Sequence, residues 1–488
     1  MKKNDQNQTA ENLQEIKASE EMAAESEPAA QIAGADDVPR ENKMGYMPCN
    51  RLLITMSLPI MISMLVQALY NIVDSIFVAR VNENALTAVS LVFPVQTLLI
   101  AVMAGTGVGI NARLSKKLGE KRFEDANHTA GNAIFLAFCS MAVFMLIGLL
   151  FSETFLSLMT KDEVISAYGT SYMRIILLLS GGFAMQVTLE RLVQATGRTV
   201  LSMISQGVGA ITNIILDPIM IFGLLGFPRM GVAGAALATV TGQWIGALLG
   251  LYFNLHHNPE LHVGIRYLRP KAEIIRQIYA VGIPSIIMQS ISSVMTFGMN
   301  KLLLGFSSTA AAVFGVYFKL QSFIFMPVFG LNNGIVPIIA YNFGARKPDR
   351  IKETFRLGVC YAVGIMFVGL LCFQFIPDVM LSLFDASETM MGIGTVALRL
   401  ISLSFLFAGF NIVCSSMFQA LGHGMLSLWT SVIRQLVVLL PAAYLLAWAM
   451  GLDALWWSFP IAEVVALLLS IFFLRHILRT QVEPLYRQ

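Results

Sequence analysis

The chain repeats many of its glycines, prolines and basic residues at a constant offset of 225 residues, so it is built from two copies of one long module. The repeat needs no gap over nearly half the chain, and the run Gln194–Gly197 returns as Gln419–Gly422. Two such modules facing each other across an aqueous cleft are typical of membrane transporters. The repeated positions are Pro59 and Pro284, Gly105 and Gly330, Gly109 and Gly334, Gly119 and Gly344, Lys121 and Arg346, Arg174 and Arg399, and Gly226 and Gly451.

Composition places the repeat in a membrane. Of the 488 residues, 56% are hydrophobic and 13% are charged, whereas a soluble domain is about one quarter charged. Apolar runs long enough to cross a bilayer predict an all-α polytopic membrane protein with 12 transmembrane helices. The runs lie near 52–79, 86–112, 129–151, 166–195, 200–226, 231–257, 275–304, 309–337, 356–376, 392–421, 426–450 and 452–476.

Residues 1–45 differ from the rest of the chain. They contain ten acidic and five basic residues, a net charge of −5, and no aromatic residue. A segment of this kind cannot bury enough surface to order itself, and no apolar run follows Lys2 and Lys3 as in a signal peptide. We therefore expect a disordered cytoplasmic tail, followed by one lobe over 46–262 and a second over 263–488.

Basic residues in the short loops predict the orientation. With the N-terminus inside, the inner loops and the C-terminal tail hold 18 Lys and Arg residues, and the outer loops hold four. Both termini are then cytoplasmic. Because each lobe has an even number of spans, the two six-helix bundles are parallel repeats. We expect a monomer in the plasma membrane, the inner membrane of a bacterium, with no nucleic-acid partner.

Carboxylates inside apolar spans are candidates for function, because an ionised side chain at the bilayer centre costs about 2.5 kcal/mol or more. Asp74 lies in the first span and Asp217 in the fifth. Helical spacing places Gln67, Tyr70 and Asn71 on the face of Asp74, and Asn213 on the face of Asp217. Polar residues in membrane bundles also serve as structural hydrogen-bonding groups, and this alternative stays open, more so for Asp217 beside Pro218.

The second half does not repeat these acids. At the same offset Asp74 becomes Met299 and Asp217 becomes Ala442, so we expect ion coupling in the first half. Met299, Asn300 and Lys301, together with Gln67, Tyr70, Asn71 and Gln186, form a predicted substrate-binding set. Glu190 beside Arg191 favours an interfacial ion pair slightly over a place in the cleft, while Lys319 and Glu463 remain weaker cleft candidates.

These motifs resemble the MATE (multidrug and toxic compound extrusion) transporters, nearest to their DinF/MepA-like branch. The resemblance covers about residues 47–480. It rests on Tyr70–Asp74, Gln194–Gly197, Asn213–Pro218, Gly231–Thr239, Met326–Gly330, Pro337 and Tyr341–Ala345.

The resemblance implies two bundles that alternate in access, driven by a proton or sodium gradient. In that family, residues matching Asp74, Asn213, Asp217 and Thr239 form the cation site of the first lobe. Members that couple through the second lobe carry acids in the seventh and tenth spans, which this chain lacks. The function it predicts is antiport: export of amphipathic, cationic drugs in exchange for H+ or Na+, without a cofactor.

Other functions are less well supported by the sequence. A flippase for a lipid-linked saccharide of the same superfamily would need a cleft rich in arginine. An enzyme is not expected, because the chain has no HExxH or GxSxG motif and no His in a span core. A passive channel would place its acids in a symmetric ring, and nothing in the chain is typical of a nucleotide-binding loop.

Overall fold

The computed structural model describes residues 41–384 and 386–487. Residues 1–40, the main part of the predicted tail, lie outside the described residues. Helix α2 (Lys43–Tyr46) begins inside the stretch 1–45 that the sequence assigns to the tail and ends one residue beyond it. The described part of the chain is helical and contains no strand, and from Asn42 onward it forms one compact unit.

The first lobe holds six spans, the fourth of which is broken. α6 and α7 are bent by 44° at residues 179–180 and together make one span. The helices are α3 (Cys49–Ala79), α4 (Glu83–Gly119), α5 (Phe123–Met159), α6 (Glu163–Leu178), α7 (Gly181–Ala195), α8 (Thr199–Phe222) and α9 (Val232–His256).

The second lobe repeats this order after a connecting segment that contains the short helix η1 (Ile265–Leu268). α14 and α15 are bent by 47°, at nearly the repeat position of the first break. The helices are α10 (Ala272–Leu304), α11 (Ser308–Gly344), α12 (Pro348–Phe375), α13 (Pro377–Ser382), α14 (Glu388–Ser402), α15 (Phe405–Ala420), α16 (Gly424–Val432), η2 (Ile433–Leu439), α17 (Leu440–Met450), α18 (Leu452–Leu455), α19 (Ser458–Ile477), η3 (Leu478–Val482) and η4 (Glu483–Arg487).

Twelve membrane spans result, as the sequence predicts. Ten helical segments are long and apolar enough to cross a bilayer, and each of the two bent pairs adds one more span. Large apolar side chains on the outside of the helices are exposed, which suits contact with lipid; Leu150, Phe297, Trp448 and Phe472 are examples.

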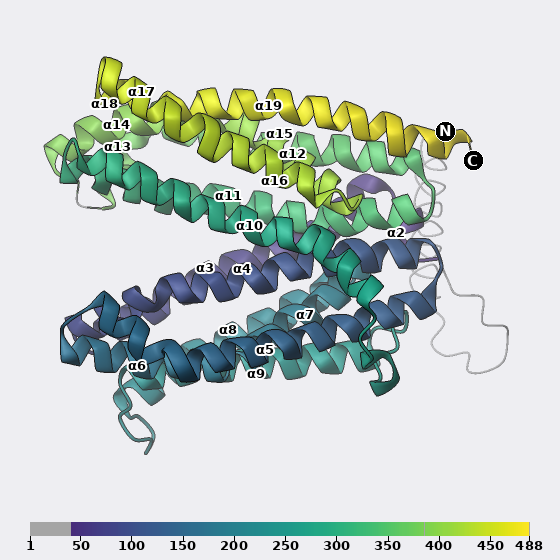
Figure 1. Cartoon of the computed structure of the whole chain (residues 1–488), viewed down its shortest axis with the longest axis horizontal. Helices are drawn as coiled ribbons and strands as arrows, with labels where there is room; N and C mark the ends of the chain where they lie inside the picture. Colours follow the sequence, from purple (N-terminus) through teal and green to yellow (C-terminus); the bar gives the residue numbers. More distant parts are fainter. Residues whose placement is uncertain (1–40, 385, 488) are drawn as a thin grey trace, which may run out of the picture. The chain divides into compact units, whose positions relative to one another are not determined.

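The two lobes lie against each other at one end and diverge toward the other (Figure 1). The closed end is the one that contains α2 and the turns at Gly197 and Gly422. The opposite end is the open end. At the closed end α4 of the first lobe crosses α11 of the second. A Cβ at Gly119 would lie well within 3.0 Å of the Tyr341 carbonyl oxygen, and one at Gly344 equally close to that of Lys116.

This contact has the two-fold symmetry of the sequence repeat, because Lys116 and Tyr341 are themselves 225 residues apart. The other repeated glycines mark further points of contact between the lobes. A Cβ at Gly105 or Gly109 would meet the backbone of α10, and one at Gly330 or Gly334 would meet α3. The repeated glycines therefore let the lobes approach backbone to backbone.

Turns at equivalent positions of the two halves have the same backbone conformation. Gly197 and Gly422 end the fourth and tenth spans with φ of 85° and 87°, a conformation that favours glycine. Lys121 and Arg346 follow the crossing helices α4 and α11 with φ of 56° and 55°.

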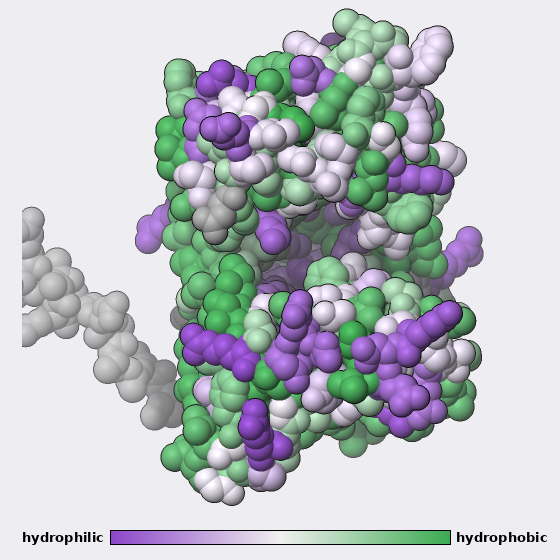
Figure 2. Space-filling model, turned by 90° about the vertical axis from the view of Figure 1, so that its left-hand side faces the viewer, coloured by the Kyte–Doolittle hydropathy of each residue, from purple (hydrophilic) through white to green (hydrophobic). Residues whose placement is uncertain are grey.

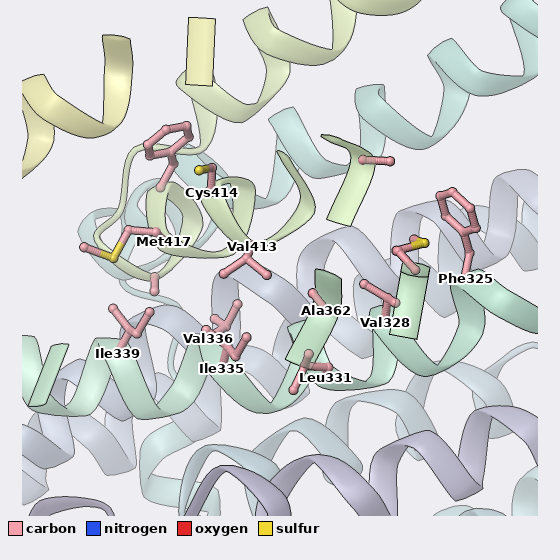
Figure 3. Close-up of a cluster of buried hydrophobic side chains, with 14 of the residues drawn as sticks. Phe325, Val328, Leu331, Ile335, Val336, Ile339, Ala362, Val413, Cys414 and Met417 are labelled. Atoms are coloured by element: carbon pink, nitrogen blue, oxygen red, sulfur yellow. The ribbon is translucent and has the colours of Figure 1, made fainter. Parts of the chain in front are cut away.

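The second lobe is organised around α11. Its apolar side chains pack against α12 and α15 in a continuous buried cluster. The labelled members in Figure 3 are Phe325, Val328, Leu331, Ile335, Val336 and Ile339 of α11, Ala362 of α12, and Val413, Cys414 and Met417 of α15. This lobe therefore has a well-filled apolar interior.

Candidate functional site

A cavity of about 430 Å³ lies between the two lobes. Seen from the open end, the molecule is hollowed between its halves, and hydrophilic residues are visible inside the hollow (Figure 2). The first lobe contributes both charged side chains of the cavity, Glu190 and Arg191, while the polar side chains of the second are all uncharged. The polar lining residues are Gln67, Tyr70, Gln186, Glu190, Arg191, Gln194, Gln206, Asn213, Thr239 and Gln243 from the first lobe, and Ser285, Gln289, Asn332, Asn333 and Gln419 from the second.

Three predicted cation ligands come together beside this cavity. Asn213 and Asp217 are one turn apart on α8, and both are buried. Asn213 Nδ2 lies 3.2 Å from Thr239 Oγ1 of α9 and 3.4 Å from Asp217 Oδ1. α8 and α9 pack closely because Gly209 faces the backbone of Gly242.

Asp74 of α3 completes the predicted set. It lies on α3, which packs against α8, the helix of Asn213 and Asp217. Three acceptor oxygens of the set are buried without a hydrogen-bond partner in the structure: Asp74 Oδ1, Asn213 Oδ1 and Asp217 Oδ2. Buried acceptors are normally satisfied, so this group of oxygen atoms is suited to receive a proton or a hard cation such as Na+.

The predicted substrate residues of α3 separate into two kinds. Gln67 and Tyr70 line the cavity, and Gln67 Oε1 accepts a hydrogen bond of 3.1 Å from Gln206 of α8. Asn71 instead has an exposed side chain and is not among the cavity residues.

The cavity contains two charged side chains, Glu190 and Arg191, for which the sequence slightly favours an interfacial ion pair. Glu190 and Arg191 line the cavity and take different partners. Glu190 Oε1 accepts from Gln186 Nε2 at 3.0 Å. Arg191 Nη1 donates to Gln194 and, across the lobes, to Asn333 Oδ1 of α11 at 3.1 Å.

Space for the Arg191 side chain depends on a glycine of α4. A Cβ at Gly107 would lie 2.9 Å from Arg191 Nε and 3.0 Å from its Cγ. Gln186, which the sequence predicts to bind substrate, lines the cavity, whereas the amides at Gln206, Gln289, Asn332 and Asn333 were not predicted. Their signal in the sequence is a polar side chain inside an apolar span.

The predicted substrate residues of α10 lie elsewhere. Met299 is fully buried in the second lobe; Lys301 is exposed near the open end of α10. Neither they nor Asn300 are among the cavity residues, to which α10 contributes Ser285, Met288 and Gln289.

Two other charged candidates also lie outside the cavity. Lys319 Nζ sits over the Phe384 ring, 5.8 Å from its centroid. Glu463 of α19 is buried within the second lobe, where it pairs with Arg434 of η2 and accepts a hydrogen bond of 2.7 Å from Asn411 of α15.

Over residues 41–384 and 386–487, no group of three or more His, Cys, Asp and Glu side chains is arranged to hold a metal ion. A site at Asp74, Asn213, Asp217 and Thr239 would be of another kind, with two carboxylates, an amide and a hydroxyl.

Comparison with known proteins agrees with this architecture. The MatE family model matches residues 59–219 and 284–445, two segments that begin 225 residues apart and together make up more than half of the chain. The multidrug export protein MepA of Staphylococcus aureus (strain MRSA252) is 28% identical over 433 residues, 88% of this chain and 94% of that protein. MepA of Staphylococcus haemolyticus is 28% identical over 417 residues, 85% and 91% of the two chains.

Solved structures of MATE transporters share the fold. An outward-facing multidrug resistance transporter of this family, 24% identical, superimposes with a TM-score of 0.84 over 93% of this chain and 100% of that chain. A mutant of the Vibrio cholerae transporter VcmN, 22% identical, gives 0.81 over 90% and 99%. These proteins are named as transporters and not as enzymes, in agreement with the prediction from the sequence.

Proposed function

We propose that this chain, which belongs to the MatE family, is a secondary active antiporter that exports amphipathic organic cations in exchange for H+ or Na+. The chemistry of the cavity and the multidrug export named for its relatives support the proposal. Small organic molecules would be the substrates, and the bilayer the medium in which the lobes move.

The observation that carries the proposal is the set of three buried, unpartnered acceptor oxygens at Asp74, Asn213 and Asp217. When both carboxylates are ionised, their negative charge attracts an organic cation into the adjacent cavity. A proton or a Na+ ion at the same oxygens removes that attraction. Two ligands that compete for one charge are thermodynamically coupled, so the gradient of one can drive the other.

We further propose that the closed end is cytoplasmic. The loops and helix ends at this end hold Arg113, Lys116, Lys117, Lys121, Arg122, Arg266, Arg269, Arg346, Lys347 and Arg350, and short basic loops stay inside. The cavity then opens outward in this structure, where an exporter releases drug and takes up the coupling ion.

Transport into inside-out membrane vesicles tests the proposal. A fluorescent lipophilic cation should accumulate in the vesicles when one gradient is imposed alone, either of pH with the lumen acidic or of Na+ with the higher concentration in the lumen. The gradient that drives accumulation identifies the coupling ion. Failure of both gradients in vesicles that contain folded protein would contradict secondary antiport.

A flippase for a lipid-linked saccharide is less well supported. Among the cavity residues the only arginine is Arg191, and Glu190 lies beside it. A pyrophosphate group would need several cationic donors and would be repelled by the neighbouring carboxylates.

A further inference from the structure

Six residues before the first span connect the two lobes at the closed end. We call this segment, residues 42–47, the strap. It includes α2 and leads through Pro48 directly into α3 of the first lobe. Although the chain continues from the strap into the first lobe, the strap packs against α11 of the second, and Met44 is completely buried.

The second lobe holds the strap by its backbone. Asn342 Nδ2 and Arg350 Nη2 each donate to the Met44 carbonyl at 3.0 Å. Arg350 also donates to the Met47 carbonyl at 2.6 Å, and Lys347 Nζ donates to that of Gly45 at 2.8 Å. Arg350 is itself oriented by a bond from its Nε to Asn342 Oδ1. These donors are mostly charged, which makes the hydrogen bonds strong.

The first lobe holds the strap through one side chain. Asn42 Nδ2 lies 2.9 Å from the Thr196 carbonyl oxygen and 2.8 and 2.7 Å from the two carboxylate oxygens of Glu260. Gly197 gives the room for this contact, since a Cβ there would lie 3.0 Å from Lys43 Cε. Asn42 is buried, so water does not replace these bonds while the strap is docked.

The sequence repeat gives a second, independent reason to regard the strap as a connection between the lobes. The segment before α10 has the corresponding place in the other half of the chain, and it docks on the opposite lobe as well. Asn132 of α5 accepts from the Lys271 amide at 2.8 Å and donates to the Arg269 carbonyl at 3.3 Å. Each lobe is thus entered by a segment that is held by the other lobe.

We propose that the strap is a latch that holds the closed end shut, and that Asn42 and Glu260 form its releasable catch. The proposal rests on the alternating access proposed above, in which the closed ends of the lobes must separate. Separation has to break either the three bonds of Asn42 or the four backbone bonds of the second lobe. Because the former all depend on one neutral amide nitrogen, they are the set that opens.

Distances between the lobes measured by pulsed EPR test the latch directly. Spin labels at Val200 of α8 and Met425 of α16 suit this purpose, because they are repeat partners at the closed end and are 45% and 48% exposed. Cys139, Cys360 and Cys372, the native cysteines that are not buried, are first replaced by Ser. Purified full-length protein in nanodiscs is measured without drug.

Asn42→Asp sets a carboxylate against Glu260 and removes the donor. We expect the ratio of separated to closed populations to rise about tenfold or more, since hydrogen bonds to a charged group contribute more than neutral ones. The exchanged pair Asn42→Asp with Glu260→Gln restores a donor opposite an acceptor and should return the wild-type distribution. A residue that only supports folding would not be rescued in this way.

Asn258→Ala is the matched control. Asn258 is equally buried and two residues from Glu260, but its amide bonds within the first lobe, to Asn254; the distances should not change. Unchanged distances in Asn42→Asp, or no return in the exchanged pair, would overturn the latch. The EPR experiment measures distances and not transport, so it tests the latch separately from the antiport. If the distances shift as expected but the vesicle experiment shows no ion-driven uptake, the antiport is rejected and the latch is kept.

Discussion

Asp74 has a buried carboxylate oxygen, Oδ1, for which the structure provides no hydrogen-bond partner. Asp74→Asn keeps the shape of the side chain and removes its charge. If that charge is what the drug and the coupling ion compete for, ion-driven uptake into vesicles should fall by about tenfold or more, while the protein inserts and purifies normally. Asn71→Ala, one turn away with an exposed side chain, is the control. Wild-type uptake in Asp74→Asn would remove this residue from the coupling site.

Glu260 gives the docked strap a dependence on pH. Burial raises the pKa of this carboxyl, against the smaller, opposite effects of Asn42, Arg198 and Lys43. When the strap undocks and exposes this carboxyl to water, its pKa returns toward the ordinary glutamate value, so the docked state binds the proton more tightly. Its contribution to docking is therefore fully present below the ordinary glutamate pKa and is lost as pH rises through the raised value.

We accordingly expect the separated population in the EPR measurement to grow from acidic toward neutral pH. Glu260→Gln should remove this change, because the charges of Lys43 and Arg198 that face the site remain while the titrating carboxyl does not. Glu273→Gln, an exposed acid on α10, should keep the wild-type dependence. A pH profile of Glu260→Gln that follows the wild type would assign the dependence to another group.

Site residues could be predicted from the sequence where the physical signal was a charge in an apolar span. Asp74 and Asp217 were found because an acid costs free energy in the bilayer, and Thr239 only through the family resemblance. Glu190 and Arg191 were taken for an interfacial pair, since their distance from the span end says nothing of which side faces the cavity. The 44° break between α6 and α7, which precedes this pair in the chain, was not predicted by any residue pattern either.

The helix crossing of α4 and α11 leaves no space for a side chain. A Cβ at Gly119 would overlap the Tyr341 carbonyl, a rigid backbone atom, so Gly119→Ala must push the lobes apart at the closed end. We expect transport to fall by about tenfold or more and the separated EPR population to increase, since overpacking costs about 1–3 kcal/mol. Gly364→Ala in α12 meets no atom within 4 Å and should leave both unchanged. Normal closure in Gly119→Ala would show that the crossing can relax.

Helices themselves were the most predictable elements. All twelve apolar runs became spans, with ends that differ by a few residues because polar residues such as Arg113 and Lys116 continue α4 beyond its apolar part. The repeat pairs Met299 with Asp74, and Met299 was predicted to bind substrate. In the structure Met299 is fully buried in the second lobe, and neither it nor Asp74 is among the cavity residues.

The two lobes share a scaffold and differ in their buried charges. In the first, one oxygen of Asp74 and one of Asp217 are buried without a hydrogen-bond partner. In the second, the buried acid Glu463 is paired within the lobe with Arg434, which lies in the π-helical segment η2, and accepts a hydrogen bond from Asn411. The guanidinium of Arg434 already balances the charge of this carboxylate, so Glu463 attracts an external cation less strongly. This contrast supports the proposal that the first lobe binds the coupling ion.

This division predicts how the pair Arg434 and Glu463 responds to substitution. Arg434→Met alone leaves an uncompensated buried charge, which typically costs about 3–5 kcal/mol, whereas replacing both members of a buried pair by neutral side chains is often nearly neutral. We therefore expect Arg434→Met to lower the thermal stability and the double variant Arg434→Met with Glu463→Gln to recover it. Uptake by the double variant should keep the wild-type dependence on the pH or Na+ gradient. If the double variant is as stable as the wild type but no longer responds to the gradient, Glu463 takes part in coupling and the second lobe is not merely a scaffold.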